Sequence, residues 1–177
     1  MRHVILAMDL SLNCPGLAVL RVCNKKISLL HVSSLDQSKS TLPAAHKIDL
    51  IRQWVEGAVS KYSPDVFVME RGFSRFPKVT QTLFRVVGVV ENTVVRLTGV
   101  SEIETIPPKE VKKLIALDGG ADKQAVARGL TPYLGPHDYR CDDESDAAAV
   151  GVAYAILKGW IRQKQNAAAR KKRRLPV

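Results

Sequence analysis

Short apolar runs that end in polar residues mark the predicted strands of this chain. Residues 4–8 are all apolar and lead directly into Asp9, a pattern that is typical of a buried central strand. Similar runs predict four further strands, at residues 17–22, 27–33, 66–69 and 102–106. Because turn residues separate the first three strands at short intervals, we expect these three to form an antiparallel meander.

Apolar positions three or four residues apart predict helices between and after the strands. One predicted helix ends at Tyr62, with Ser40 or Thr41 as its N-cap and Pro43 in its first turn. The other predicted helices cover residues 79–97, 108–118, 122–133 and 143–160. The first helix connects the third and fourth strands as a crossover would, so the fourth strand should run parallel to its neighbour. The pattern therefore predicts an α/β fold with a five-stranded mixed sheet, a three-strand antiparallel meander plus two parallel strands, flanked by helices.

Length and composition fit one soluble domain. The chain has 177 residues, of which 46% are hydrophobic, enough for a substantial core. We expect a folded domain over residues 1–163 and a basic, disordered tail over 164–177. The sequence lacks both an apolar run of the roughly 18 residues in a membrane helix and the regions of a signal peptide. The cysteines, Cys14, Cys23 and Cys141, show no CxxC spacing, which favours reduced thiols in a cytoplasm over disulfides or a zinc site.

The net charge of +10 is concentrated at the C-terminal end of the chain. All eight charged residues after Asp146 are basic, whereas acids and bases nearly balance before it. A basic protein with a cationic end favours a polyanionic partner, most often nucleic acid. A solvated tail that only aids solubility is the alternative.

Four carboxylates stand where the predicted fold would gather them. Asp9 and Glu70 each end a predicted strand, and open α/β sheets bind ligands at the carboxyl ends of their strands. Asp143 and Asp146 are three residues apart at the start of the last helix, so they share one helical face. Asp9 could instead be a turn residue, and one acid of the helix a cap. Asp142 could take the place of Asp143 after a shift of one residue.

Carboxylates gathered at one place repel one another unless cations accompany them. Hard oxygen ligands select Mg²⁺ or Mn²⁺. Two such ions about 4 Å apart can activate a water and stabilise the leaving oxygen of a phosphodiester. The sequence contains no CxxC, HExxH, GxSxG or GxxxxGK[ST] motif, which makes other common chemistries less favoured.

In this order the acids resemble the motifs of the RuvC-type Holliday junction resolvases, which belong to the RNase H-like superfamily. The similarity covers about residues 4–161. Asp9 followed by Gly16 is similar to the first motif of that family, Glu70 to the second, and the segment 143–150 to the last. Leu10-Ser11 follows Asp9 where the family usually has Pro-Gly, a variant more similar to the divergent viral and phage branch. Some relatives have His at the position of Asp143.

The resemblance implies a homodimer that binds a four-way DNA junction and nicks two strands symmetrically, in a bacterial or phage-infected cell. It implies two Mg²⁺ per subunit, for which Mn²⁺ may substitute. The implied catalytic residues and metal ligands are Asp9, Glu70, Asp143 and Asp146. The helix 79–97 corresponds to the one that contacts the other subunit. We expect its stripe of Val86, Val87, Val90 and Val94, around Gly88, to serve both the core and the partner.

The resemblance also indicates DNA contacts. Phe73 stands where the family carries an aromatic that stacks on junction bases, and Lys112 and Lys123 match basic positions near the scissile phosphate. The basic loop after Glu70 adds three cationic candidates, Arg71, Arg75 and Lys78. The alternatives are a loop aromatic folded onto the core and lysines that are ordinary solvated charges.

Two other functions compete with a structure-selective endonuclease. The first is a catalytically inactive junction- or nucleic-acid-binding module on the same fold. The four acids argue against it, because binding needs lysines and not a carboxylate cluster. The second is an actin-like or sugar-kinase-like ATPase, which would need a longer chain and Gly-rich phosphate loops.

Overall fold

A five-stranded mixed sheet forms the middle of the molecule. The computed structural model describes residues 2–72 and 76–164. The strands are β1 (Arg2–Asp9), β2 (Gly16–Cys23), β3 (Lys26–Ser34), β4 (Val66–Glu70) and β5 (Glu104–Ile106). Their order in the sheet is β3-β2-β1-β4-β5. The pairs β1–β2 and β2–β3 are antiparallel, and β1–β4 and β4–β5 are parallel. The predicted meander and the predicted parallel strands are thus confirmed.

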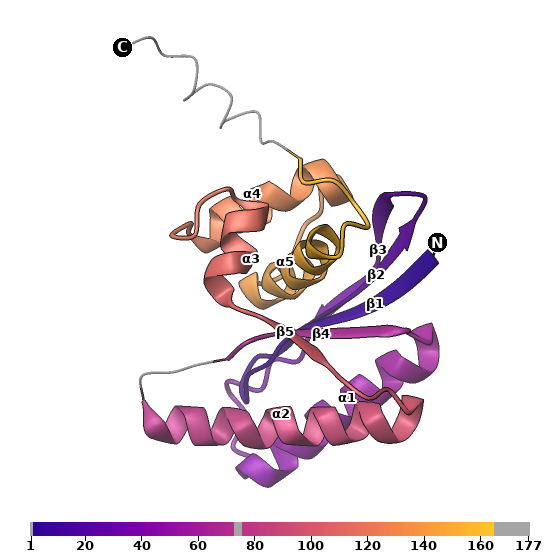
Figure 1. Cartoon of the computed structure of the whole chain (residues 1–177). Coiled ribbons are helices and arrows are strands. Elements are labelled where there is room, and N and C mark those ends of the chain that lie inside the picture. The colour runs from indigo at the N-terminus through magenta and orange to yellow at the C-terminus, as the bar shows by residue number, and fades with distance from the viewer. Residues whose placement is uncertain (1, 73–75, 165–177) are drawn as a thin grey trace.

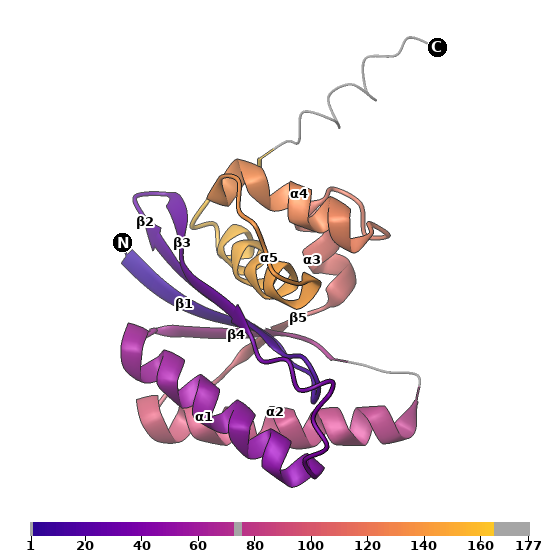
Figure 2. The same cartoon turned by 180° about the vertical axis from the view of Figure 1, so that it is seen from behind.

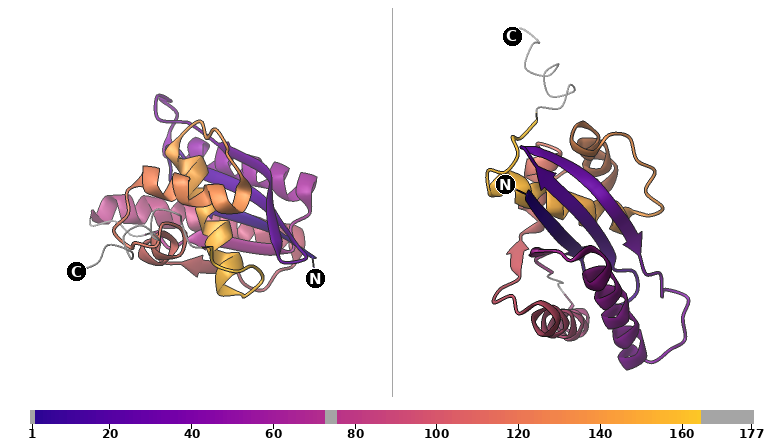
Figure 3. Two further views of the ribbon diagram at one scale, coloured as in Figure 1. Left: turned by 90° about the horizontal axis from the view of Figure 1, so that it is seen from above. Right: turned by 90° about the vertical axis from the view of Figure 1, so that its right-hand side faces the viewer.

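Helices cover both faces of this sheet. They are α1 (Ala44–Tyr62), α2 (Pro77–Thr98), α3 (Pro108–Ile115), α4 (Lys123–Leu134) and α5 (Asp142–Leu157). Figure 1 shows α3, α4 and α5 on one face and α1 and α2 on the other, and Figure 2 shows the same layers from behind. From above, α4 and α5 lie across the strands (Figure 3, left). Among the helices of the described residues, none has the length and apolar character needed to cross a membrane.

Two hydrophobic cores follow from the alternation of side chains along the strands. Ile5 and Ala7 of β1 point to the core under α3, α4 and α5, whereas Leu6 and Met8 point to the core over α1 and α2. Successive residues of a strand face opposite sides of the sheet, so a strand buried on both faces must be apolar throughout. This explains the unbroken apolar run that precedes Asp9.

The N-terminus of α1 differs from the prediction. The N-cap is Pro43, without a side-chain cap, and the Oγ of Ser40 accepts from the backbone N–H of Leu42 instead (3.3 Å). The residue before a proline is biased away from the helical region, so the helix begins only after Pro43. The N-cap of α4 is Asp122, whose Oδ1 accepts from the Ala125 N–H (2.6 Å).

The valine stripe of α2 also differs from the prediction. Val86, Val90 and Val94 are fully buried in the core of this chain, and Val87 packs against the same core. Val86, Val90 and Val94 therefore serve the core alone, whereas Val87 is partly exposed at its edge. A Cβ at Gly88 would meet no atom within 4 Å among the described residues, so this glycine lies on the outer side of the helix.

Candidate active site

Parallel pairing of β1 with β4 brings Asp9 and Glu70 to the same edge of the sheet. The register pairs Met8 with Met69, so the next residue of each strand is an acid. Asp9 also pairs with Gly16 of β2, and Glu70 with Ile106 of β5. Both carboxylates therefore stand at the carboxyl ends of adjacent central strands, where α/β sheets place ligands.

Small residues let α5 approach this edge closely. A Cβ at Gly16 would lie 1.9 Å from the backbone carbonyl oxygen of Asp143, so only glycine fits between β2 and the first turn of α5. Further along α5, a Cβ at Gly151 would lie 2.4 Å from Leu20 and 3.0 Å from Ala7. These small residues thus allow α5 to pack directly against β1 and β2. As a result, the acids at the N-terminus of α5 lie near the ends of the strands.

The charges of Glu70, Asp146 and Asp143 act on Asp9 at the end of β1. Burial raises the pKa of Asp9 to about 8, and the charges of Glu70, Asp146 and Asp143 add to the shift. Burial also raises the pKa of Glu70 to about 7, with a further contribution from Asp146. Burial likewise raises the pKa of Asp146. Carboxylates that are desolvated and face like charges hold their protons more strongly, so these groups form one electrostatic cluster.

Two of the predicted lysines lie at this cluster. The Nζ of Lys123, at the start of α4, is 3.3 Å from Oδ2 of Asp146 and 3.8 Å from Oδ2 of Asp142. The charge of Lys123 acts against the raised pKa of Asp9, and Lys112 of α3 together with Lys123 acts against that of Glu70. Both acids keep a raised pKa in spite of these cations, because burial, together with the neighbouring acids, outweighs the effect of the lysines.

The first turn of α5 contains acids in three different settings. Asp143 contributes to the raised pKa of Asp9, whereas Asp142 is not among the groups that do so. The side chain of Asp142 is 63% exposed, against 17% for Asp146. These observations favour Asp143 over Asp142 as the fourth member of the cluster.

Glu144 is a buried acid that the sequence analysis did not single out. Its carboxylate accepts from the backbone N–H and the guanidinium of Arg140 (3.0 and 3.1 Å) and from the hydroxyl of Ser34 (3.2 Å). These hydrogen bonds satisfy the carboxylate of Glu144 on the side of β3. Glu144 therefore anchors the start of α5 and is separate from the cluster. Its burial follows from the tertiary contact with β3, for which the local sequence holds no signal.

The cluster fits hard divalent cations. Carboxylates from β1, β4 and α5 raise one another's pKa there, and their repulsion in a desolvated place is what bound cations would offset. The residues that could hold such ions are Asp9, Glu70, Asp143 and Asp146.

The remaining predicted DNA contacts follow Glu70 in the sequence. Arg71 is exposed, and its guanidinium is 3.4 Å from the Thr105 hydroxyl. Lys78 is exposed in the first turn of α2. Phe73 and Arg75 lie outside the described residues, as does the predicted tail from residue 165 onward.

The sequence of this chain matches a known protein family. The profile described as "Crossover junction endodeoxyribonuclease RuvC" matches residues 5–154. A protein of that name from Renibacterium salmoninarum is 27% identical over 161 residues, which are 88% of this chain and 79% of the relative. A second, from Christiangramia forsetii, is 30% identical over 135 residues, 75% of this chain and 68% of the relative.

Comparison with solved structures supports the fold. The Thermus thermophilus RuvC in complex with a Holliday junction substrate aligns with a TM-score of 0.79 and 24% identity, over 88% of this chain and 94% of that one. The yeast mitochondrial Holliday junction resolvase Ydc2 aligns with a TM-score of 0.66 and 14% identity, over 94% and 83%. The fowlpox virus Holliday junction resolvase aligns with a TM-score of 0.57 and 14% identity, over 88% and 99%.

Proposed function

Because this chain belongs to the RuvC family of crossover junction endodeoxyribonucleases, we propose that it resolves four-way DNA junctions by symmetric hydrolysis of phosphodiester bonds. The observation that carries the proposal is the convergence of acids from β1, β4 and α5 into one electrostatic cluster. A protein that only binds junctions would need cationic contacts to phosphates. It would gain nothing from carboxylates whose repulsion costs stability, so the cluster favours catalysis over the inactive alternative.

The proposed cofactor is Mg²⁺, two ions in each subunit, with Mn²⁺ as a substitute. Asp9, Glu70, Asp143 and Asp146 would hold them. When bound, the two ions supply an activated water and a stabilised leaving oxygen for phosphodiester hydrolysis. The paired strands β1 and β4 hold Asp9 and Glu70 in place. The close contact of α5 with Gly16 holds the acids of that helix.

Lys123 and Lys112 have a proposed role in holding the substrate phosphate. Both approach the cluster from α4 and α3, and Lys123 is only partly engaged, through ion pairs of 3.3 and 3.8 Å. A lysine at this place attracts the anionic backbone toward the carboxylates, which would otherwise repel it. It also keeps the acid of Asp146 oriented toward Asp9 and Glu70.

A nicking assay tests the proposed function. A labelled four-way junction and a linear duplex of the same sequence are incubated with the protein in Mg²⁺, in Mn²⁺ and in EDTA. We expect paired nicks in two opposite strands of the junction with either metal, little cutting of the duplex and none in EDTA. Metal-independent cutting would contradict the assigned cofactor, and tight junction binding without any cutting would favour the inactive alternative.

We further propose that the protein acts as a homodimer through the outer face of α2, defined by Phe84, Gly88 and Val95. Symmetric nicking of a two-fold substrate needs two sites related by a two-fold axis. On this face Phe84 and Val95 are 61% and 44% exposed. Large apolar residues gathered on one helix face favour a partner surface.

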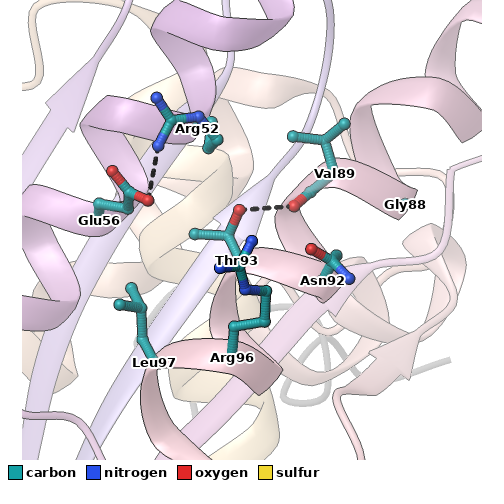
Figure 4. Close-up of a pocket in the computed structure, with 8 residues that line it drawn as sticks. All are labelled: Arg52, Glu56, Gly88, Val89, Asn92, Thr93, Arg96 and Leu97. Atoms are coloured by element: carbon teal, nitrogen blue, oxygen red, sulfur yellow. Dashed lines mark hydrogen bonds and ion pairs between the residues drawn. The ribbon is translucent and has the colours of Figure 1, made fainter.

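A hollow beside this face is consistent with a self-complementary contact. It has a volume of about 540 Å³ and lies between α1 and α2 (Figure 4). Its lining residues are Arg52, Glu56, Gly88, Val89, Asn92, Thr93, Arg96 and Leu97. In a two-fold dimer, an exposed aromatic such as Phe84 could enter the corresponding hollow of the second copy.

Phe84→Arg is expected to convert the dimer to a monomer at micromolar concentration, because a charge would be buried without a partner in the apolar contact. Sedimentation velocity measures the state, and the nicking assay should show that paired nicks are lost. Leu157→Arg is the matched control, since Leu157 is 47% exposed and belongs to α5 in the other layer. A dimeric Phe84→Arg protein, or a monomeric wild type, would remove this face from consideration.

Phe73→Ala is expected to weaken junction cleavage more than duplex binding. Phe73 stands three residues after Glu70 in the sequence, between Arg71 and Arg75. An unpaired base at the crossover can stack on an aromatic ring, which is worth about 1–3 kcal/mol. Duplex DNA offers no such base, so its affinity should depend on phosphate contacts and fall with salt. Both substrates are compared at matched salt, and an equal effect on both would mean that Phe73 has no junction-specific role.

A further inference from the structure

Two cysteines that are far apart in the sequence meet beside the candidate active site. Cys14 belongs to the loop between β1 and β2, and Cys141 is the N-cap residue of α5. Ligand atoms of Cys14, Cys141 and Asp143 all lie within 4.8 Å of one another. Both thiols are free and half-buried, so they are neither linked nor open to bulk solvent.

The contacts around Cys14 hold its loop in place. The N–H of Cys14 donates to Oγ of Ser11 (3.0 Å). The carbonyl of Asn13 accepts from the N–H of Gln37 (2.6 Å) and that of Pro15 from Leu35 (3.1 Å). The side chain of Asn13 accepts from the Nζ of Lys47 (3.1 Å). Cys14 is thus flanked by fixed residues on both sides.

The contacts of α5 fix the other two groups. Cys141 makes no side-chain cap to the helix, so its sulfur is not engaged in holding α5. The backbone of Asp143 is pressed against Gly16, where a Cβ would lie 1.9 Å from its carbonyl oxygen. Burial and the neighbouring carboxylate of Asp143 raise the pKa of the Cys14 thiol, in keeping with the short separation of their ligand atoms. The three groups therefore face one another from two rigid supports.

We propose that Cys14, Cys141 and Asp143 form a site for a thiophilic divalent cation such as Zn²⁺, separate from the hard-ion site. Bonds of about 2.0–2.3 Å in a tetrahedral zinc site place neighbouring ligand atoms about 3.5–3.8 Å apart. Rotations of the side chains can bring ligand atoms within 4.8 Å to that spacing. Two sulfur ligands select zinc over Mg²⁺, water completes the coordination, and the two thiol protons pass to solvent on binding.

Asp143 links this site to the nuclease chemistry, and this step rests on the proposed function. The same carboxylate belongs to the cluster with Asp9, so a cation held by the cysteines engages Asp143 and draws it away from the Mg²⁺ ligands. Zinc bound at the cysteines would therefore inhibit junction cleavage in the presence of Mg²⁺. The cysteines are not ligands of the hard-ion site. In this proposal they bind the thiophilic cation and so make cleavage sensitive to it.

Cobalt titration of the full chain tests the site without any use of nuclease activity. Co²⁺ bound by thiolates gives a charge-transfer absorption in the near ultraviolet. In the presence of a phosphine reductant, we expect this band for the wild type at one equivalent, with displacement by Zn²⁺. The band should be lost in Cys14→Ser and in Cys141→Ser. It should remain in Cys23→Ser, because Cys23 is exposed at the far end of β2. Absence of the band in the wild type, or its persistence in both serine variants of the site, would overturn the proposal.

The nicking assay then tests the consequence. At fixed Mg²⁺, increasing Zn²⁺ should inhibit the wild type and Cys23→Ser alike, whereas Cys141→Ser should need about tenfold more Zn²⁺ or higher, as expected for a weakened site. Equal inhibition of all three proteins would show that the cysteine site does not control the active site. If the cobalt band behaves as expected but no variant cleaves junctions, the metal site stands and the proposed nuclease function fails.

Discussion

Asp9→Asn should abolish junction cleavage while junction binding is retained. Asp9 ends the central strand β1 and feels the charges of Glu70, Asp146 and Asp143, so it would be the ligand that the proposed ions share. Asparagine keeps the shape and removes the anionic charge. Because the ions contribute several kcal/mol to such a reaction, the rate should fall by about 10³-fold or more. Asp146→Asn should behave in the same way.

A stability measurement separates lost catalysis from lost folding. Burial raises the pKa of Asp9 from 3.8 to about 8, so the metal-free folded state binds a proton that the unfolded chain releases. The acid therefore costs stability, and this cost grows as the pH rises from about 4 to about 8. Asp9→Asn should raise the Tm of the metal-free protein at pH 7, by about 2–4 °C for each kcal/mol relieved. It should also lose the rise in Tm that Mg²⁺ gives the wild type.

Asp142→Asn and Asp143→Asn form a matched pair for the fourth ligand. Asp142 is exposed and Asp143 contributes to the shift of Asp9. We expect Asp143→Asn to lose most cleavage and Asp142→Asn to retain most of it. Full cleavage by Asp9→Asn in Mg²⁺ would refute the assignment of the cluster, and the reverse order of the pair would assign the ligand to Asp142.

Gly16→Ala is expected to have the second largest effect, although alanine is the smallest possible addition. The new Cβ would lie 1.9 Å from the carbonyl oxygen of Asp143 and 3.3 Å from Cβ of Ala147. Backbone must move to admit it, so α5 shifts away from β2. Overpacking of this kind costs about 1–3 kcal/mol. A displacement of about 1 Å at the acids of α5 could cost about 100-fold in cleavage.

Gly57→Ala is the matched control for this substitution. Gly57 lies within α1, and a Cβ there would meet no atom within 4 Å among the described residues. Alanine in a helix interior is favoured over glycine by about 1 kcal/mol, so this variant should be slightly more stable and fully active. Chemical denaturation and the nicking assay measure both proteins. A Gly16→Ala protein with the stability and activity of the wild type would mean that α5 is not held by this contact.

Much of the fold was predictable because it follows from the local pattern of apolar and polar residues. The strands β1 and β4 are buried on both faces, so their apolar runs are unbroken and end at acids. The topology rules for a crossover then placed β4 parallel to β1. The N-terminus of α1 was predicted wrongly because the bias at Leu42, before Pro43, outweighs the capping preference of Ser40 or Thr41.

The sequence by itself indicated the candidate acids, because Asp9 and Glu70 end predicted strands and Asp146 shares a helix face with Asp143, with Asp142 as the alternative. Only the tertiary structure decided what depends on contacts between distant segments. The effect of Asp143 on Asp9 and the exposure of Asp142 favour Asp143 over Asp142, and the contact with Ser34 makes Glu144 an anchor. The core takes up Val86, Val90 and Val94 of α2 and leaves Phe84 outside. Cys14 and Cys141 become neighbours because the β1–β2 loop meets the start of α5, and no sequence spacing encodes that meeting.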